Sequence, residues 1–270
     1  MDPLSFDFFR TGLAAATLAG ALCGLIGAYV VLRGMSYIGH GLSHAVFGGA
    51  VASSVLGVNF YAGAGAWGFA SALLINQISR RRRVGADAAI GVVTTASFAI
   101  GLAIISRSRS FTRNFEAALF GSVLGVSGAD VAVLGSIALA AGAFIFLCYR
   151  PLLFTAFDPE VAEASGVPSR TMDALFAVVL AACVAATMRV LGVTLVAAAL
   201  VIPASTARLL TNSFSRMLRL STGLGAVSGA AGMFLSYSLD VASGATIVLV
   251  AALIFAVVFT VTARPRIRRR

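Results

Sequence analysis

The sequence predicts an all-α polytopic membrane protein. Three observations carry this prediction: 59% of the 270 residues are hydrophobic, only 11% are charged, and the mean hydropathy is +0.98. A soluble domain carries about 25% charged residues, so this composition excludes an ordinary soluble fold. The apolar residues also gather in stretches of about 20, the length that an α-helix needs to cross a bilayer.

Nine apolar stretches can be marked between polar residues or Gly/Pro breaks, and each predicts one transmembrane helix. They are Phe9 to Leu32, Tyr37 to Leu56, Phe60 to Ile78, Ala88 to Ile105, Val131 to Tyr149, Met172 to Met188, Leu191 to Leu210, Leu218 to Tyr237 and Ala245 to Ala263. The first is long enough to cross and lacks a small-residue cleavage site, so we expect a retained helix. We expect residues 1–270 to form a single membrane domain.

The placement of the arginines predicts an orientation. All twenty basic residues are arginine, and Arg80 to Arg83 follow the third stretch. Basic loops stay in the cytoplasm, so this loop is expected inside. Counting stretches then places the amino terminus outside and the basic tail 264–270 in the cytoplasm. The same count puts further basic residues inside: Arg33, Arg150, Arg208, Arg216 and Arg219.

One loop disagrees with this orientation, because Arg107, Arg109 and Arg113 follow the fourth stretch and would lie outside. The net charge of +10 is thus mainly a topology signal, with contact to anionic membrane lipid. No nucleic-acid partner is expected, since the charge sits in short loops between apolar stretches.

The only two histidines, His40 and His44, stand four residues apart inside the second apolar stretch. Residues i and i+4 share one face of a helix, so the two imidazoles can converge on one transition-metal ion. Ionisable groups at bilayer depth are costly and usually functional. The alternative is that the two rings only form hydrogen bonds with neighbouring helices.

Residues 157–168 predict a short helix between two apolar stretches. Asp158 is placed to cap it, Pro159 suits its first position, and Glu160 and Glu163 lie near its positive end. Gly166 then ends it. Acidic residues at the start of a short helix, beside a face of small residues, are typical of a docking element for a partner protein. The small residues here are Ala162, Ala164 and Gly166. The alternative is an ordinary surface turn.

The chain has no lysine and therefore no Walker-type GxxxxGK[ST] loop. It cannot hydrolyse ATP by that route, so an ATP-driven process would need an ATPase on another subunit. Its three cysteines, Cys23, Cys148 and Cys183, lie far apart in apolar stretches and are expected to be packing residues.

Four segments, in order along the chain, resemble the ABC-3 family of permeases from metal-ion ABC importers. The segment 36–46, SYIGHGLSHAV, resembles the family signature near the second helix, and 158–167 resembles its coupling helix. The segment 200–207, LVIPASTA, and 235–246, LSYSLDVASGAT, are similar to two later family stretches.

This resemblance implies a type II ABC importer-like permease bundle in the bacterial inner membrane, with no catalytic activity of its own. It implies a homodimer, a separate ABC ATPase that contacts Asp158, Pro159, Glu160, Glu163 and Gly166, and an extracytoplasmic metal-binding protein. No permanently bound cofactor is expected, because the metal is the transported substrate.

The resemblance also implies that the second helix holds the ion in transit. His44 falls on the family's histidine, whereas His40 replaces the family's aspartate. An imidazole in place of a carboxylate favours Zn²⁺ over Mn²⁺ or Fe²⁺, which stay the alternatives. Asp240 is a further candidate ligand, although an aspartate there more often caps a helix or turn.

Two other classes stay open on the residues. A secondary metal transporter would need no ATPase, but such proteins usually show inverted repeats and carboxylates within the membrane, and neither is evident here. A membrane metalloprotease would need a general base between its ligands, as in HExxH. Gly41, Leu42 and Ser43 separate the two histidines, and none can serve as that base.

Overall fold

A computed structural model describes residues 3–79, 86–107, 119 and 121–262 of the chain. In these residues every regular element is helical, as predicted. The nine long helices are α1 (Asp7–Leu32), α2 (Ser36–Leu56), α3 (Phe60–Ser79), α4 (Ala86–Arg107), α6 (Gly128–Leu147), α9 (Ser169–Leu191), α10 (Val193–Leu210), α11 (Phe214–Leu239) and α12 (Ser243–Thr262). Two short helices, α7 (Tyr149–Phe157) and α8 (Pro159–Ala164), connect α6 to α9.

Each predicted apolar stretch coincides with one of these long helices to within a few residues. By length and apolar composition, five of the described helices qualify as membrane spans: α1, α6, α9, α10 and α12. Helix α2 is long enough but contains four glycines, four serines and both histidines, which lower its hydropathy. The count of nine spans therefore stays a prediction, whereas the helices themselves are present.

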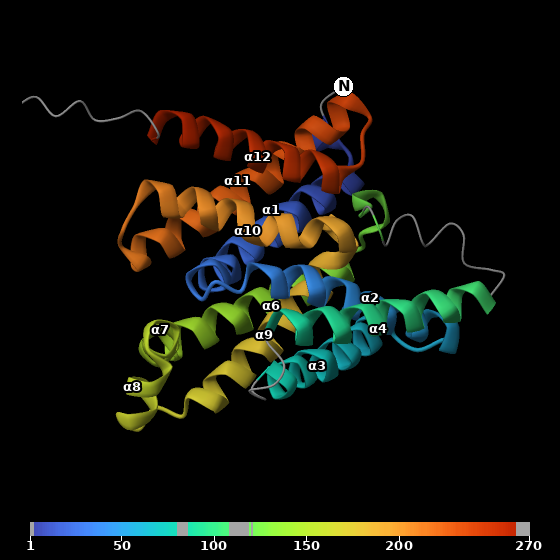
Figure 1. Cartoon of the computed structure of the whole chain (residues 1–270). Helices are drawn as coiled ribbons and strands as arrows, with labels where there is room; N and C mark the ends of the chain where they lie inside the picture. Colours follow the sequence, from blue (N-terminus) through green and yellow to red (C-terminus); the bar gives the residue numbers. More distant parts are fainter. Residues whose placement is uncertain (1–2, 80–85, 108–118, 120, 263–270) are drawn as a thin grey trace, which may run out of the picture.

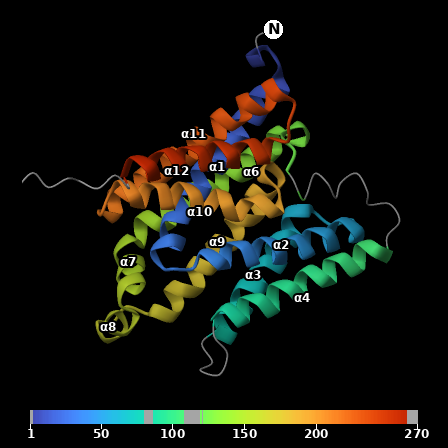
Figure 2. The same cartoon turned by 45° about the horizontal axis from the view of Figure 1, so that its top comes forward.

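Successive long helices run in opposite directions through the bundle (Figure 1). The bundle thus has two ends. At the Arg33 end, α1 stops and α2 begins; at the Asp240 end, α11 stops and α12 begins. Both views place α7 and α8 together at the Arg33 end (Figures 1 and 2). The arginines at 80–83, Arg109, Arg113 and the tail 264–270 lie outside the described residues.

Helix α1 is the centre of the bundle and packs most extensively against α11. A methyl group added at Gly20 would overlap the backbone carbonyl of Gly225, so the two backbones are in direct contact. The Ser221 hydroxyl donates a hydrogen bond to the Gly24 carbonyl across the same interface. Small residues therefore allow the close helix contact that apolar membrane helices need.

One helix break differs from the prediction. The weak break that the sequence suggested at Arg189 lies at Gly192, where φ is +81° and the chain turns from α9 directly into α10. Glycine adopts this backbone conformation without the steric penalty of a side chain. Arg189 consequently lies in the last turn of α9, where its side chain contacts neighbouring helices.

Candidate functional site

The two histidines lie together on α2. Their ring centroids are 4.8 Å apart and the rings meet edge to face, at 83°. Helix α2 is continuous through both residues, so the i, i+4 spacing alone brings them to one face. The two rings therefore contact each other on one side of α2, and the alternative that they also serve contacts with neighbouring helices stays open.

The two rings differ in their surroundings. His40 is exposed on the surface of the single chain, whereas His44 is half-buried. The His44 ring packs against Phe98 of α4, with centroids 5.0 Å apart. Within the described residues, its buried Nδ1 has no hydrogen-bond partner. The pair therefore presents one surface imidazole and, behind it, a second imidazole with an unsatisfied nitrogen.

Among the described residues, no third His, Cys, Asp or Glu side chain joins the pair, and no group of three or more such side chains could hold a metal ion. Asp240 is the C-cap of α11, and its backbone adopts the left-handed conformation with φ of +53°. It belongs to the far end of the bundle and lines a separate cavity of about 460 Å³ with Tyr237. Its geometry matches the capping alternative, and its role as a ligand stays a prediction.

The predicted short helix is present as α8. The Asp158 carboxylate accepts a hydrogen bond from the Val161 backbone amide at 3.0 Å, and Pro159 occupies the first helical turn. The Glu163 carboxylate accepts one from the Ser169 hydroxyl at 3.2 Å. The helix ends at Ala164, and Gly166, two residues later, has a φ of +83° that turns the chain away.

The exposed face of α8 differs from the predicted small face. Ala162 is fully buried in the chain, so it cannot contact a partner. Exposed positions include Glu160, Val161, which is 49% exposed, and Ala164. A partner would therefore meet a mixed acidic and apolar surface.

Sequence reasoning assigned Arg33 only to topology, but the structure gives it a second role. Its guanidinium donates hydrogen bonds to the Asp173 carboxylate at 2.8 Å and to the Thr155 hydroxyl at 2.9 Å, and it lies 4.8 Å from the Phe176 ring centroid. These partners lie on α9 and α7. Arg33 also lines a cavity of about 440 Å³ that reaches Pro159 of α8. The turn before α2 is thus bound to both helices that flank α8.

A second charged cluster lies nearer the Asp240 end. Asp130 forms a capping box with Ser127, the N-cap of α6. The same buried carboxylate also pairs with Arg189 of α9 and accepts a hydrogen bond from the Tyr61 hydroxyl of α3 at 2.6 Å. No sequence pattern links these three residues, because they lie on three different helices.

Comparison with known proteins identifies the family. The model of the ABC 3 transport family matches residues 5–262, nearly the whole chain. The chain belongs to the ABC 3 transport family.

Members of the family with curated names support the same assignment. The chain is 41% identical over 256 residues to the manganese transport system membrane protein MntC of Halalkalibacterium halodurans, covering 95% of this chain and 88% of MntC. It is 33% identical to the chelated iron transport system membrane protein YfeC of Yersinia pestis, with 94% and 86% covered. Among solved structures, PsaBC from Streptococcus pneumoniae in complex with Fab matches with a TM-score of 0.86 and 35% identity, covering 94% of this chain and 91% of that chain.

These ABC 3 relatives bear on the predicted ion. Their names refer to manganese and iron transport systems, and none of those cited here refers to zinc. The preference for Zn²⁺, which rests on the two imidazole donors alone, stays a prediction.

Proposed function

We propose that this chain is the permease subunit of an ATP-driven importer of divalent transition-metal ions, with His40 and His44 as the transient ligands of the ion. The observation that carries the proposal is the pair of imidazole rings, 4.8 Å apart on one face of a helix in an ABC 3 family member. Imidazole nitrogens are ligands for transition metals and not for Mg²⁺ or Ca²⁺.

Manganese is the ion that the relatives favour, since the MntC and ScaB proteins among them carry manganese names. Zinc is the second candidate, because two nitrogen donors suit it better than they suit Mn²⁺. Because the described residues hold no group of three or more His, Cys, Asp or Glu side chains, water or a second copy would complete the coordination. Weak, incomplete coordination by the protein favours release of a transported ion.

We further propose that the Arg33 end faces the cytoplasm and that the amino terminus lies outside. Most of the described arginines support this orientation: Arg150, Arg208, Arg216 and Arg219 belong to the Arg33 end, whereas Arg10, Arg107 and Arg189 belong to the other end. The exposure of His40 on the single chain supports a homodimer in which the second copy faces that surface. The remaining partners are an ABC ATPase and an extracytoplasmic metal-binding protein.

The coupling route follows from the contacts of Arg33. An ATPase that moves α8 also moves α7 and α9, because these helices flank it in the chain. Arg33 binds both helices and is separated from the start of α2 by only Gly34 and Met35. A movement of α8 would therefore reach the helix that carries the histidines, with no need for a contact between α8 and the site.

The metal site is tested by replacing both histidines. We expect His40→Ala with His44→Ala to abolish uptake of radioactive Mn²⁺ and Zn²⁺ by cells that express the whole importer. Ser54→Ala is a matched control, since Ser54 is an exposed polar residue farther along the same helix. Normal uptake by the double variant, at equal membrane levels, would refute the site.

Two measurements separate the remaining alternatives. Competition of Mn²⁺ uptake by Zn²⁺ and Fe²⁺ identifies the preferred ion. Disabling the ATP site of the partner ATPase should stop uptake; persistent uptake would favour a secondary transporter instead.

A further inference from the structure

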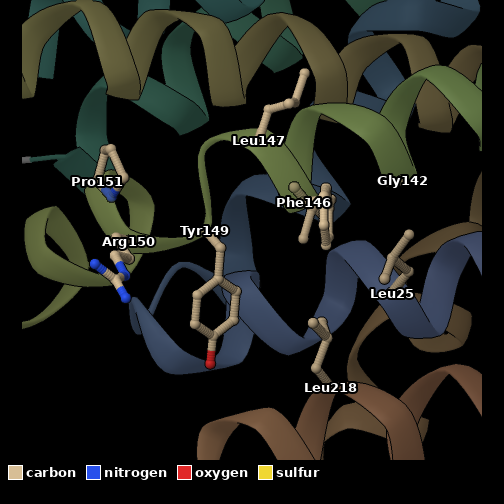
Figure 3. Close-up of a pocket in the computed structure, with 9 residues that line it drawn as sticks. Leu25, Gly142, Phe146, Leu147, Tyr149, Arg150, Pro151 and Leu218 are labelled. Atoms are coloured by element: carbon tan, nitrogen blue, oxygen red, sulfur yellow. The ribbon is translucent and has the colours of Figure 1, made fainter.

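A groove lies on the surface at the joint between α6 and α7, far along the chain from the histidines. Its volume is about 760 Å³, within the usual range of small-molecule sites. Leu25 of α1, Gly142, Ile145 and Phe146 of α6, Arg150 of α7 and Leu218 of α11 line it (Figure 3). Four separate helices thus contribute to one concave surface.

The apolar part of the groove faces outward at the end of a membrane span. Phe146 is 82% exposed and the adjoining Leu147 is 78% exposed. Both belong to the last turn of α6, which is apolar and long enough to cross a bilayer. Contiguous large apolar side chains at this depth need a hydrocarbon partner, because water would leave them unfavourably solvated.

The lining of the groove changes from apolar to charged within a few residues. Arg150 follows Leu147 by three positions, in the first turn of α7, and Figure 3 shows it at the opposite side of the groove from Leu25. It is exposed, and it forms no ion pair with another described residue. An unpaired cation directly beside the end of an apolar span lies at headgroup level, where arginine attracts anionic lipid.

We infer that this groove binds one anionic phospholipid, with an acyl chain along Leu25, Phe146 and Leu218 and the phosphate on Arg150. The apolar wall and the single cation match the two parts of such a lipid in the order that a bilayer imposes. The inference does not depend on the transported ion or on the histidines, so it can fail while the proposed function stands.

Two glycines of α6 offer a matched pair of variants. Gly142 lines the groove, and a Cβ added there meets no atom within 4 Å. Gly135, two turns earlier on the same helix, also has open space around an added Cβ and does not line the groove. Gly142→Leu therefore fills the groove, and Gly135→Leu makes the same chemical change outside it.

The test measures lipid retention on the purified importer. The complete complex is incubated with equal amounts of phosphatidylglycerol and phosphatidylcholine, and native mass spectrometry counts the lipids that stay bound. We expect retention of one phosphatidylglycerol per permease in the wild type and in Gly135→Leu, and its loss in Gly142→Leu. Equal retention by the two leucine variants would overturn the proposal.

The headgroup contact is tested separately, which keeps the proposal falsifiable if Gly142→Leu does not fold. Arg150→Gln should lower the preference for phosphatidylglycerol over phosphatidylcholine about fivefold, equivalent to about 1 kcal/mol. Arg208→Gln is the control, an exposed arginine at the same end that does not line the groove. Equal effects of the two arginine variants would overturn the assignment of the phosphate to Arg150. Separation of permease dimers by Gly142→Leu, but not by Gly135→Leu, would also overturn the proposal, because it would place a second copy of the chain in the groove.

Discussion

We expect the two partners of the Arg33–Asp173 ion pair to differ in how much stability is lost when each is removed, because they are buried to different extents. The Arg33 side chain is 7% exposed, whereas the Asp173 side chain is 31% exposed. Removing the aspartate leaves a nearly buried guanidinium with no carboxylate partner in the described part of the chain and only its hydrogen bond to Thr155. Removing the arginine leaves a carboxylate that water can partly solvate.

The two losses can be ranked in free energy. Breaking a buried pair by removing one partner costs about 3–5 kcal/mol, and we expect Asp173→Ala to fall near about 3 kcal/mol because Asp173 is not fully buried. Arg33→Met keeps the apolar packing on Phe176 and loses mainly hydrogen bonds, at about 1–2 kcal/mol. Three kcal/mol lowers the melting midpoint of a chain of this size by about 6–12 °C.

The assay is the thermal midpoint of the purified chain in detergent, followed by fluorescence-detected size exclusion. Arg33→Met added to Asp173→Ala should recover part of the lost stability, because it removes the stranded charge. Asp7→Ala is the control: its pair with Arg10 is almost fully exposed, at 3.8 Å, and no shift is expected. An Arg33→Met variant less stable than Asp173→Ala, or a double variant less stable than either, would refute the reasoning.

The remaining predictions use the same thermal measurement or ATPase activity. Gly20→Val should cost about 1–3 kcal/mol because it forces α1 away from α11, whereas Gly223→Ala, with open space around an added Cβ, should be neutral; equal effects would contradict the close contact. Arg189→Met, which strands a carboxylate only 8% exposed, should destabilise by about 3 kcal/mol, and Tyr61→Phe by about 1 kcal/mol; the reverse order would argue against the cluster. Gly166→Ala, at φ of +83°, should cost about 1–2 kcal/mol locally and lower the stimulation of the partner ATPase by metal, with unchanged stimulation as the contrary result.

The helices were predictable because membrane insertion depends on a local property, the length of an apolar stretch. The start of α7 directly after α6 was not predictable from the sequence. Helix α7 begins with Tyr149, Arg150 and Pro151, a pattern that indicates the end of a membrane span and not a new helix. The predicted small face of α8 was wrong at one residue: Ala164 and Gly166 are exposed, but the chain itself buries Ala162.

The histidine pair is the part of the candidate site that the sequence alone determined. Residues four apart on a helix meet whatever the rest of the chain does, so the closeness of His40 and His44 needed no tertiary information. The same holds for the cap at Asp158 and the stop at Gly166. Each of these features spans less than three helical turns.

Only the tertiary structure decided which distant residues meet. Arg33 and Asp173 are 140 positions apart, Asp130 and Arg189 are 59 apart, and the groove at Arg150 takes residues from four helices. Lipid tails are as apolar as the side chains of the spans, so hydropathy sets which segments cross the membrane but not which pack together. That choice rests on the shapes of the helix surfaces, such as the glycine contact of α1 with α11, and it places Asp240 away from the histidines.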